Sequence, residues 1–289
     1  MDGRIAVLGL GQMGSGMARA LLAAGTRITA FNRSADKAAP VAAAGATIAG
    51  SAAEAVDGAD VVVLSLADEA AVTELLFGEL DGRLRKGTTV VDTSTVTPSF
   101  AKEAAERLAG AGIRRVEACV LGNPQMAAAG RLRVFAAGEE SDVDAVRWVL
   151  DALGQEVRYL GPAGSASVLK LAFNLMLGVQ TLGLAEAVVF AEAMGIDRGL
   201  LLDAFEGSGW RSAVLSFRGE FMRRKEYRPA AFRAALMHKD LGLARRESAG
   251  HGVELPVVHC AAERYAEMLA AGLGDEDAAA VVELGDTRR

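Results

Sequence analysis

Cysteine, histidine and proline are all scarce in this sequence: its 289 residues include two cysteines, three histidines and six prolines. Cys119 and Cys260 are far apart, and neither forms a Cys-x-x-Cys pair or has a pair of histidines nearby. The sequence therefore predicts neither a disulfide framework nor a zinc site. A reducing cytoplasm is the default compartment for such a chain, and we expect no bound metal.

Positive charge and aromatic side chains are also in short supply. Lys and Arg number 31 against 37 Asp and Glu, a formal net charge of -6. This argues against a nucleic-acid partner, because phosphate neutralisation needs a basic surface. Aromatic residues make up 5% of the chain and hydrophobic residues 51%, so the core would consist largely of Ala, Val and Leu. A folded protein with a small ligand fits this balance.

Uninterrupted hydrophobic runs of membrane-spanning length are missing as well. Residues 1–4 lead straight into an apolar run, without the charged region and cleavage site of a secretory signal. The longest apolar stretch, residues 169–195, is interrupted by Lys170, Asn174, Gln180, Glu186 and Glu192. Because a charge at mid-bilayer costs roughly 2.5–3.5 kcal/mol, we expect no membrane span.

Short apolar runs alternate with helix-like segments through the first part of the chain. Strands are expected at residues 5–8, 27–31, 46–48, 61–66, 89–92, 114–118, 132–137 and 157–160. Helices are expected at residues 15–24, 35–44, 52–56, 70–77, 101–109 and 142–153. Such repeated strand–helix units predict a doubly wound parallel sheet with right-handed crossovers, an α/β fold.

After Gly161-Pro162-Ala163-Gly164 the strand signals cease and helical periodicity continues to the end. Helices are expected at residues 165–194, 198–204, 215–224, 231–250, 256–271 and 276–284. The domain boundary is placed here, with an α/β domain over 1–161 and an all-α domain over 162–289. The first helix is apolar on most sides, so it should pack against the α/β domain, a partner subunit, or both. Trp148 and Trp210 are interpreted as packing residues.

The segment Gly9-Leu10-Gly11-Gln12-Met13-Gly14 directly follows the first strand and opens the first helix. Gly9 permits a tight turn, Gly11 lets backbone N–H groups approach a pyrophosphate, and Gly14 allows close helix–strand packing. A simple strand–helix turn would also use glycine, but the continuing alternation favours a dinucleotide site in a Rossmann domain. All six residues are candidate cofactor contacts.

The second strand ends in Asn32-Arg33-Ser34, where an NAD-preferring site would carry Asp or Glu for the ribose 2′-hydroxyl. Asn32 and Ser34 can donate hydrogen bonds to a 2′-phosphate, and the planar cation of Arg33 suits phosphate. The segment therefore favours NADP(H). The alternative is that Arg33 is only a solvated surface charge.

Lys170 and Asn174 lie four residues apart, on one face of the first C-terminal helix. In a partly buried cleft the ammonium pKa of Lys170 would fall toward that of a general acid, and Asn174 would hold the reacting oxygen. The alternative is a lysine that extends to the surface.

Two further polar segments are candidates for the same site. Asp92-Thr93-Ser94-Thr95, with Pro98 after it, follows a strand end where open α/β sheets place ligands. Its hydroxyls could contact nicotinamide or substrate, while Thr97 or Ser99 could cap the next helix. His238-Lys239-Asp240 interrupts an apolar helix and is either a second contribution to the cleft or a solvated stripe.

These segments, in this order, resemble the β-hydroxyacid dehydrogenase family, which includes 3-hydroxyisobutyrate dehydrogenases and glyoxylate/succinic semialdehyde reductases. The resemblance covers nearly the whole chain. It implies that Lys170 is the general acid/base, that Asp240 contacts substrate, and that the cofactor is NADP(H). It also implies further cofactor contacts, at Leu66, Ala67, Thr95, Phe232 and Lys239.

One block departs from the family pattern. Where the family usually has Asp-Ala-Pro-Val-Ser-Gly-Gly, this chain has Glu117-Ala118-Cys119-Val120-Leu121-Gly122-Asn123. Leu121, Gly122 and Asn123 would line the substrate pocket, but Leu121 lacks a hydroxyl and Asn123 adds bulk, which puts recognition of a hydroxy-carboxylate in doubt. The segment 123–125 is also similar to the imine reductases, which generally lack the catalytic lysine.

The sequence thus predicts an NADP(H)-dependent oxidoreductase that transfers hydride between nicotinamide and a small aldehyde, ketone or hydroxy acid. Imine reduction is the second hypothesis, and a catalytically silent NADP-binding protein is the third. The long helix and the C-terminal helices, by the family resemblance, imply a homodimer.

Overall fold

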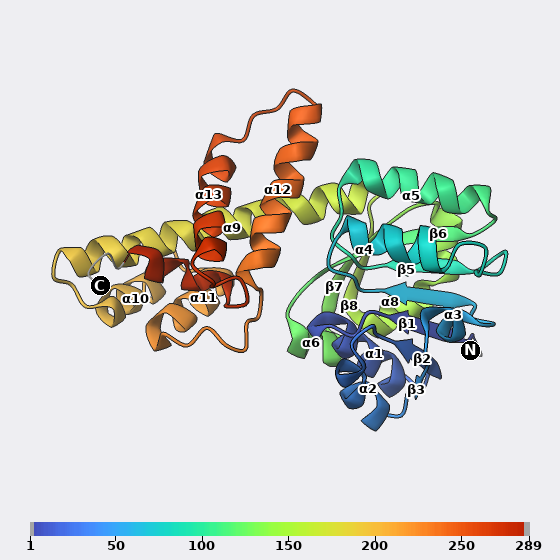
Figure 1. Cartoon of the computed structure of the whole chain (residues 1–289). Helices are drawn as coiled ribbons and strands as arrows, with labels where there is room; N and C mark the ends of the chain where they lie inside the picture. Colours follow the sequence, from blue (N-terminus) through green and yellow to red (C-terminus); the bar gives the residue numbers. More distant parts are fainter. Residues whose placement is uncertain (1–2, 286–289) are drawn as a thin grey trace. The chain divides into compact units, whose positions relative to one another are not determined.

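The computed structural model describes residues 3–285, and the chain forms two compact units, Met1–Lys170 and Leu171–Arg289. The division lies inside one long helix, α9 (Ser165–Ala193), shortly after the 161–164 loop where the sequence analysis places the domain boundary. The first unit is α/β and the second is helical (Figure 1), as the sequence predicts.

The α/β unit contains one eight-stranded sheet with the order β3-β2-β1-β4-β5-β6-β7-β8. Its strands are β1 (Ile5–Leu8), β2 (Ile28–Phe31), β3 (Thr47–Ile48), β4 (Val61–Leu64), β5 (Thr89–Asp92), β6 (Arg114–Leu121), β7 (Leu132–Ala137) and β8 (Gly154–Tyr159). The strand order reverses between β1 and β4, so the carboxyl ends of these two strands form the switch point where doubly wound sheets bind ligands.

The sheet is mostly parallel, as the sequence predicts, with one antiparallel pair. β6 and β7 pair antiparallel, with Glu117 opposite Ala137 and Leu121 opposite Arg133, whereas all other neighbours are parallel. The chain between β6 and β7 holds only the short helix α6 (Pro124–Ala128), which the sequence did not predict. A parallel crossover needs a dozen or more residues, so this short link returns the chain in the opposite direction.

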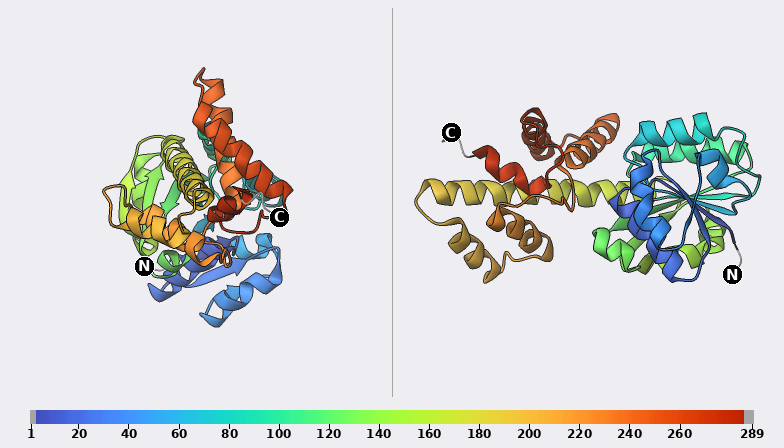
Figure 2. Two further views of the ribbon diagram at one scale, coloured as in Figure 1. Left: turned by 90° about the vertical axis from the view of Figure 1, so that its left-hand side faces the viewer. Right: turned by 60° about the horizontal axis from the view of Figure 1, so that its bottom comes forward.

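Helices cover both faces of the sheet (Figures 1 and 2). They are α1 (Gln12–Ala23), η1 (Ala35–Ala38), α2 (Ala39–Ala43), α3 (Ala52–Val56), α4 (Glu69–Glu74), η2 (Leu75–Glu79), α5 (Pro98–Gly110), α7 (Glu140–Ala145) and α8 (Arg147–Leu153), with α6. Ile5 and Val7 of β1 pack into the core under α1, α2, α6, α7 and α8. Ala6 and Leu8 pack into the core under α3, α4 and α5. Alternate strand residues thus fill two separate cores.

Several predicted helices differ in detail from the observed ones. The helix expected at 142–153 is interrupted at Val146, which separates α7 from α8. The helix expected at 70–77 changes from α to π geometry at Leu75. The last expected helix, 276–284, is instead the 3-10 helix η3 (Ala278–Gly285).

The helical unit consists of the rest of α9 with α10 (Arg198–Glu206), α11 (Ala213–Arg224), α12 (Ala234–Gly250), α13 (Pro256–Ala270) and η3. Its core combines Leu184 and Val188 of α9 with Met237, Tyr265 and Val281, all almost fully buried. By length and composition α9 could cross a membrane, but this is weak evidence because core helices pass the same test.

Several large apolar side chains of the helical unit remain outside its core. Trp210, interpreted from the sequence as a packing residue, is 79% exposed, which corrects that interpretation. Trp148 does pack, against the α/β core. Phe190 and Met194 near the end of α9, and Leu200 of α10, are also more than 60% exposed.

Candidate active site

The loop between β1 and α1 carries the three glycines of the predicted cofactor motif. Gly9 has a φ of 92°, and a Cβ built there would lie 2.3 Å from the carbonyl oxygen of Ser65, so only glycine fits. A Cβ at Gly14 would lie 2.0 Å from the Gly9 carbonyl oxygen. Beside Gly11, by contrast, no atom of the described neighbours lies within 4 Å of such a Cβ.

The glycines therefore have different roles in this loop. Gly9 and Gly14 determine its shape, whereas Gly11 leaves open space at the amino end of α1. Gly11 is the N-cap residue of α1 and has no side chain to accept hydrogen bonds from the first-turn N–H groups. Those N–H groups suit the phosphate oxygens of a dinucleotide, so the loop fits a nicotinamide cofactor. Leu10, Gln12 and Met13 lie in the same loop and first turn.

Asn32, at the end of β2, is tied to this loop. Its Oδ1 accepts a hydrogen bond from the N–H of Leu10 at 2.8 Å, and its Nδ2 donates to the carbonyl oxygen of Ser34 at 2.9 Å. Part of the side chain predicted to bind a 2′-phosphate thus holds two backbone segments together. Arg33 and Ser34 are exposed, and no carboxylate occupies positions 32–34.

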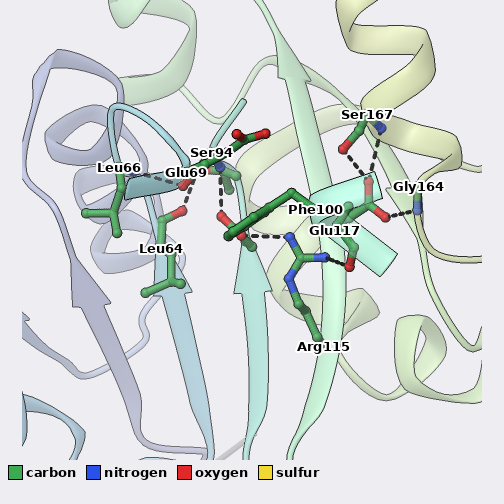
Figure 3. A network of polar contacts seen from close by, with 12 residues as sticks. Leu64, Leu66, Glu69, Ser94, Phe100, Arg115, Glu117, Gly164 and Ser167 are labelled. Carbon is green, nitrogen blue, oxygen red and sulfur yellow. Dashed lines mark hydrogen bonds and ion pairs between the residues drawn. The ribbon is translucent and has the colours of Figure 1, made fainter. Parts of the chain in front are cut away.

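The carboxyl ends of β4 and β5 are joined by hydroxyl groups. The Ser94 hydroxyl accepts a hydrogen bond from the N–H of Leu66 at 3.0 Å, and the Thr93 hydroxyl donates to the carbonyl oxygen of Leu64 at 2.6 Å (Figure 3). Both hydroxyls therefore form hydrogen bonds with backbone groups of the protein itself. Of the four residues 92–95, only Thr95 is not buried, and Ala67 is exposed beyond Leu66.

Thr97 begins α5, as one of the two expected capping residues. Its hydroxyl accepts from the N–H of Phe100 at 3.2 Å and donates to the carboxylate of Glu69 at 2.6 Å. Glu69, in the first turn of α4, also accepts from the Thr97 N–H at 2.7 Å. The capping interpretation of this segment is confirmed.

Lys170 is half-buried beside the end of β6. Its Nζ donates a hydrogen bond to the carbonyl oxygen of Val120 at 2.9 Å. Leu121 packs against the apolar cluster of Cys119 and Phe135, and Gly122 follows with a φ of 146°. The Lys170 amine therefore contacts the segment that departs from the family pattern.

Asn123 and Cys119, in the same segment, have neutral side chains. The Asn123 side chain caps α6 by accepting a hydrogen bond from the N–H of Met126 at 2.9 Å. Burial, with the nearby charge of Glu117, raises the pKa of the Cys119 thiol to about 12, so the thiol stays neutral at physiological pH. Neither residue offers a charge to a substrate.

In the helical unit, Asn174 and Asp240 lie together. The Nδ2 of Asn174 donates to the Asp240 carboxylate at 2.5 Å, and Lys239 forms an ion pair with Asp240 at 2.9 Å. The structure thus places Asp240 and Asn174 in the interior, which excludes a solvated stripe for Asp240. Phe232 is half-buried, and its backbone N–H donates to the carboxylate of Asp277 at 3.0 Å.

A buried polar network that the sequence did not predict lies among β5, β6 and the start of α9. Asp92 and Arg115 form an ion pair at 2.8 Å with side chains 0% and 1% exposed, and the carboxylate of Glu117 receives donors from Gly164 and Ser167 (Figure 3). The available signal was the alternation of charged Arg115 and Glu117 with apolar Val116 and Ala118 in the strand expected at residues 114–118.

Comparison with known proteins decides the family. Residues 4–161 match the NAD binding domain of 6-phosphogluconate dehydrogenase, and residues 164–285 match the profile described as NAD-binding of NADP-dependent 3-hydroxyisobutyrate dehydrogenase. The chain belongs to the β-hydroxyacid dehydrogenase family. It is therefore an NAD(P)-dependent oxidoreductase with a nicotinamide cofactor, as the sequence resemblance predicts.

Similar proteins align with nearly the whole chain. Glyoxylate/succinic semialdehyde reductase 1 of Arabidopsis thaliana is 30% identical over 281 residues, covering 96% of this chain and 97% of that protein. The NAD-dependent L-serine dehydrogenase of Pseudomonas aeruginosa is 32% identical over 292 residues, with 98% of each covered. The 3-hydroxyisobutyrate dehydrogenase of Mycobacterium tuberculosis, solved with L-serine, superimposes with a TM-score of 0.86 at 32% identity over 98% of this chain and 99% of that one.

The fold of this β-hydroxyacid dehydrogenase family member also occurs in imine reductases. The imine reductase from Pseudomonas sp. has a TM-score of 0.63 and 20% identity over 98% of this chain and 99% of that one. At this identity the likeness concerns the fold alone.

Proposed function

We propose that this protein is an NADP(H)-dependent oxidoreductase for a small aldehyde, ketone or hydroxy acid, with Lys170 as its general acid/base. The observation that carries the proposal is the hydrogen bond between the Lys170 amine and the Val120 carbonyl. Named relatives act on glyoxylate, succinic semialdehyde or L-serine, which are small polar molecules of this class.

The partner of the lysine suits proton transfer. A backbone carbonyl orients the amine of Lys170 but, unlike a carboxylate, does not neutralise its charge. Lys170 can therefore donate a proton to a developing alkoxide during reduction, or accept one from an alcohol during oxidation. A bound nicotinamide supplies or accepts the hydride.

The preference for NADP(H) rests on the end of β2. Arg33 is exposed and can pair with a 2′-phosphate, and residues 32–34 carry no carboxylate to hold a 2′-hydroxyl. Family membership does not decide between the cofactors, because the serine dehydrogenase relative is NAD-dependent. The Asn32 side chain supports the site indirectly, through its bond to the Leu10 N–H.

Imine reduction is the second candidate, favoured by the substrate segment. Leu121 is apolar and packs beside Cys119, and the Asn123 side chain is engaged in capping α6. Such a segment offers no charge for a substrate carboxylate. A neutral carbonyl or a cyclic imine would suit it better than a hydroxy acid.

We also propose that the protein is a homodimer. The helical unit exposes large apolar side chains on the end of α9, on α10 and in the loop before α11: Phe190 at 67%, Met194 at 65%, Leu200 at 62% and Trp210 at 79%. A second copy of the chain would bury such a surface. A dimer mass measured by light scattering would support the homodimer, and a monomer mass would contradict it.

The enzyme proposal is tested by Lys170→Ala with Lys170→Arg as a charge-preserving control. NADPH oxidation is followed with a panel of aldehydes, ketones, hydroxy acids and cyclic imines. Loss of general acid catalysis should lower kcat about 100- to 10,000-fold, while NADPH affinity measured by fluorescence stays within about twofold. Full turnover by Lys170→Ala would remove the mechanism. Tight NADPH binding by the wild type without turnover of any compound would favour a catalytically silent protein.

A further inference from the structure

The carboxylate of Glu117 holds the first turn of α9. One carboxylate oxygen accepts from the backbone N–H of Gly164, and the other accepts from the N–H of Ser167 at 3.0 Å and its hydroxyl at 2.7 Å (Figure 3). Glu117 and Ser167 are 2% and 1% exposed. Three donors from one helix start therefore converge on a single carboxylate that lies on a strand.

This arrangement replaces the local cap that a helix usually has. The first N–H groups of a helix have no acceptor within the helix, and a negative charge there interacts favourably with the helix dipole. Here the acceptor comes from β6, some fifty positions earlier in the chain. The nearest buried cation of the network, Arg115, is already paired with Asp92 at 2.8 Å. The Glu117 charge is thus satisfied chiefly by the start of α9.

The same strand and the same helix are joined a second time at Lys170. Lys170 follows Ser167 by three residues on α9, and Val120 follows Glu117 by three residues on β6. The Nζ of Lys170 donates to the Val120 carbonyl oxygen at 2.9 Å. Two attachments therefore set the rotation and height of this turn of α9 against the end of β6: one at Glu117 and one at the lysine itself.

We propose that Glu117 is the positioning residue for Lys170, holding the amine at the end of β6 by anchoring the turn of α9 that precedes it. This rests on the proposed role of Lys170 as general acid/base. The carboxylate acts through the helix start and does not touch the reacting atoms. Its negative charge also favours the ammonium form of the nearby lysine.

The test compares Glu117→Gln, Glu117→Asp and Ser167→Ala in the full-length protein. In Glu117→Gln one oxygen becomes an NH2 group, which faces an N–H donor instead of accepting from it. Misplacement of the amine should lower kcat on the order of 10- to 100-fold, with KM for NADPH within about twofold. The alkaline limb of the kcat profile should move to lower pH, because a negative charge near the lysine is lost.

The other two variants separate misplacement of the lysine amine from a general loss of folded structure. Glu117→Asp keeps the charge, so its kcat profile should retain the wild-type alkaline limb even where kcat is reduced. Ser167→Ala removes one of three donors and should lower kcat roughly threefold to tenfold. Thr88→Val is the matched control, because Thr88 is also buried and donates to a backbone carbonyl, at the opposite end of the strands. It should leave kcat and its pH profile unchanged.

The outcomes distinguish this inference from the proposed function. If Lys170→Ala abolishes turnover but Glu117→Gln keeps wild-type kcat and pH profile, the positioning role is overturned while the catalytic role stands. If Lys170→Ala keeps full turnover, the catalytic role itself fails. Should Glu117→Gln not fold, Ser167→Ala decides, since wild-type kcat in that variant contradicts the proposal and a reduced kcat with unchanged NADPH binding supports it.

Discussion

Asn174 donates a hydrogen bond of 2.5 Å to the Asp240 carboxylate inside the helical unit. Both residues are buried, with 3% of Asn174 and 2% of Asp240 exposed. The Asn174 amide was expected to hold a reacting substrate oxygen, yet it donates to a carboxylate of its own protein. Asp240 in turn pairs with Lys239 at 2.9 Å. The two residues therefore stabilise the unit whatever else they contact.

Replacing Asp240 by Ala should be strongly destabilising. The substitution leaves the buried Asn174 amide and the Lys239 ammonium without their carboxylate, so the free energy of unfolding should fall by about 2–4 kcal/mol. Urea unfolding of Asp240→Ala, Asn174→Ala and the double variant measures the coupling. Strictly additive losses would show that the hydrogen bond contributes little.

The glycines of the β1–α1 loop should separate stability from cofactor binding. Gly9→Ala places a Cβ 2.3 Å from the Ser65 carbonyl oxygen at a φ of 92°, so thermal stability should fall sharply. Gly11→Ala meets no described neighbour within 4 Å, so it should fold with the wild-type melting temperature. Its methyl group would nevertheless obstruct the pyrophosphate, and NADPH affinity should drop at least about tenfold. Equal NADPH affinity in Gly11→Ala and wild type would contradict a cofactor site at this loop.

Arg33 should carry the preference for NADP(H). Removing a charged hydrogen-bond donor to the 2′-phosphate in Arg33→Ala should cost about 1.5–3 kcal/mol of NADPH binding, a factor of about 10 to 150, with little effect on NADH. Steady-state kinetics with both cofactors measures the ratio. Arg27→Ala removes an exposed cation from just before β2 and serves as the control. An equal loss for NADH and NADPH would rule out recognition of the phosphate by Arg33.

The fold was accessible from the sequence because its determinants are local. The glycine motif and the alternation of apolar runs predict β1 and β4, the strands of the switch point, and β1 has its expected bounds. The antiparallel turn into β7 was not accessible, because it depends on the length of the link through α6. The break at Val146 was not accessible either, because no glycine or proline marks it in the sequence.

The candidate site was accessible only as separate segments. Lys170 and the glycines are conspicuous in sequence, since one is a charge in an apolar helix and the others form a spaced motif. The partners of Glu117 are not conspicuous in sequence. Gly164 and Ser167 lie far from it along the chain, and the N–H groups that they donate are present in almost every residue. Exposure also depends on tertiary structure, which is why the exposed state of Trp210 was missed.

The Cys119 thiol should remain unreactive, and it should lower the free energy of unfolding at alkaline pH. Burial raises its pKa from an ordinary 9.0 to about 12. Between these values the unfolded thiol loses its proton while the folded thiol keeps it, so stability falls as pH rises, by up to about 1.4 kcal/mol per pH unit. Cys119→Ala should show a shallower loss of stability above pH 9 in urea unfolding.

Thiol labelling gives an independent measure of the same burial. At pH 8 a disulfide reagent should modify the exposed Cys260 in the native protein, and both cysteines after unfolding. Cys260→Ser should then show almost no native labelling. Rapid labelling of that variant would mean that Cys119 is accessible and that the predicted alkaline effect should be absent.

Asp277 should be the most sensitive carboxylate of the helical unit. It is 0% exposed, accepts from the Arg218 guanidinium at 2.5 and 2.7 Å, and accepts from the N–H groups of Ala231, Phe232 and Ala279 at 3.0 Å each. It thereby ties α11 to the segments before α12 and within η3. Asp277→Asn leaves a buried cation without its anion, so the free energy of unfolding should fall by about 3–5 kcal/mol.

The segments that Asp277→Asn destabilises can be located by hydrogen exchange. Hydrogen exchange of Asp277→Asn should accelerate in α11 and η3 while β1, β4 and β5 keep their protection, because the lost contacts all lie in the helical unit. Arg224→Ala is the control on α11, since its pair with Glu220 is exposed and contributes at most about 1 kcal/mol. If Asp277→Asn unfolds no more easily than Arg224→Ala, the Arg218 pair does not hold these helices together.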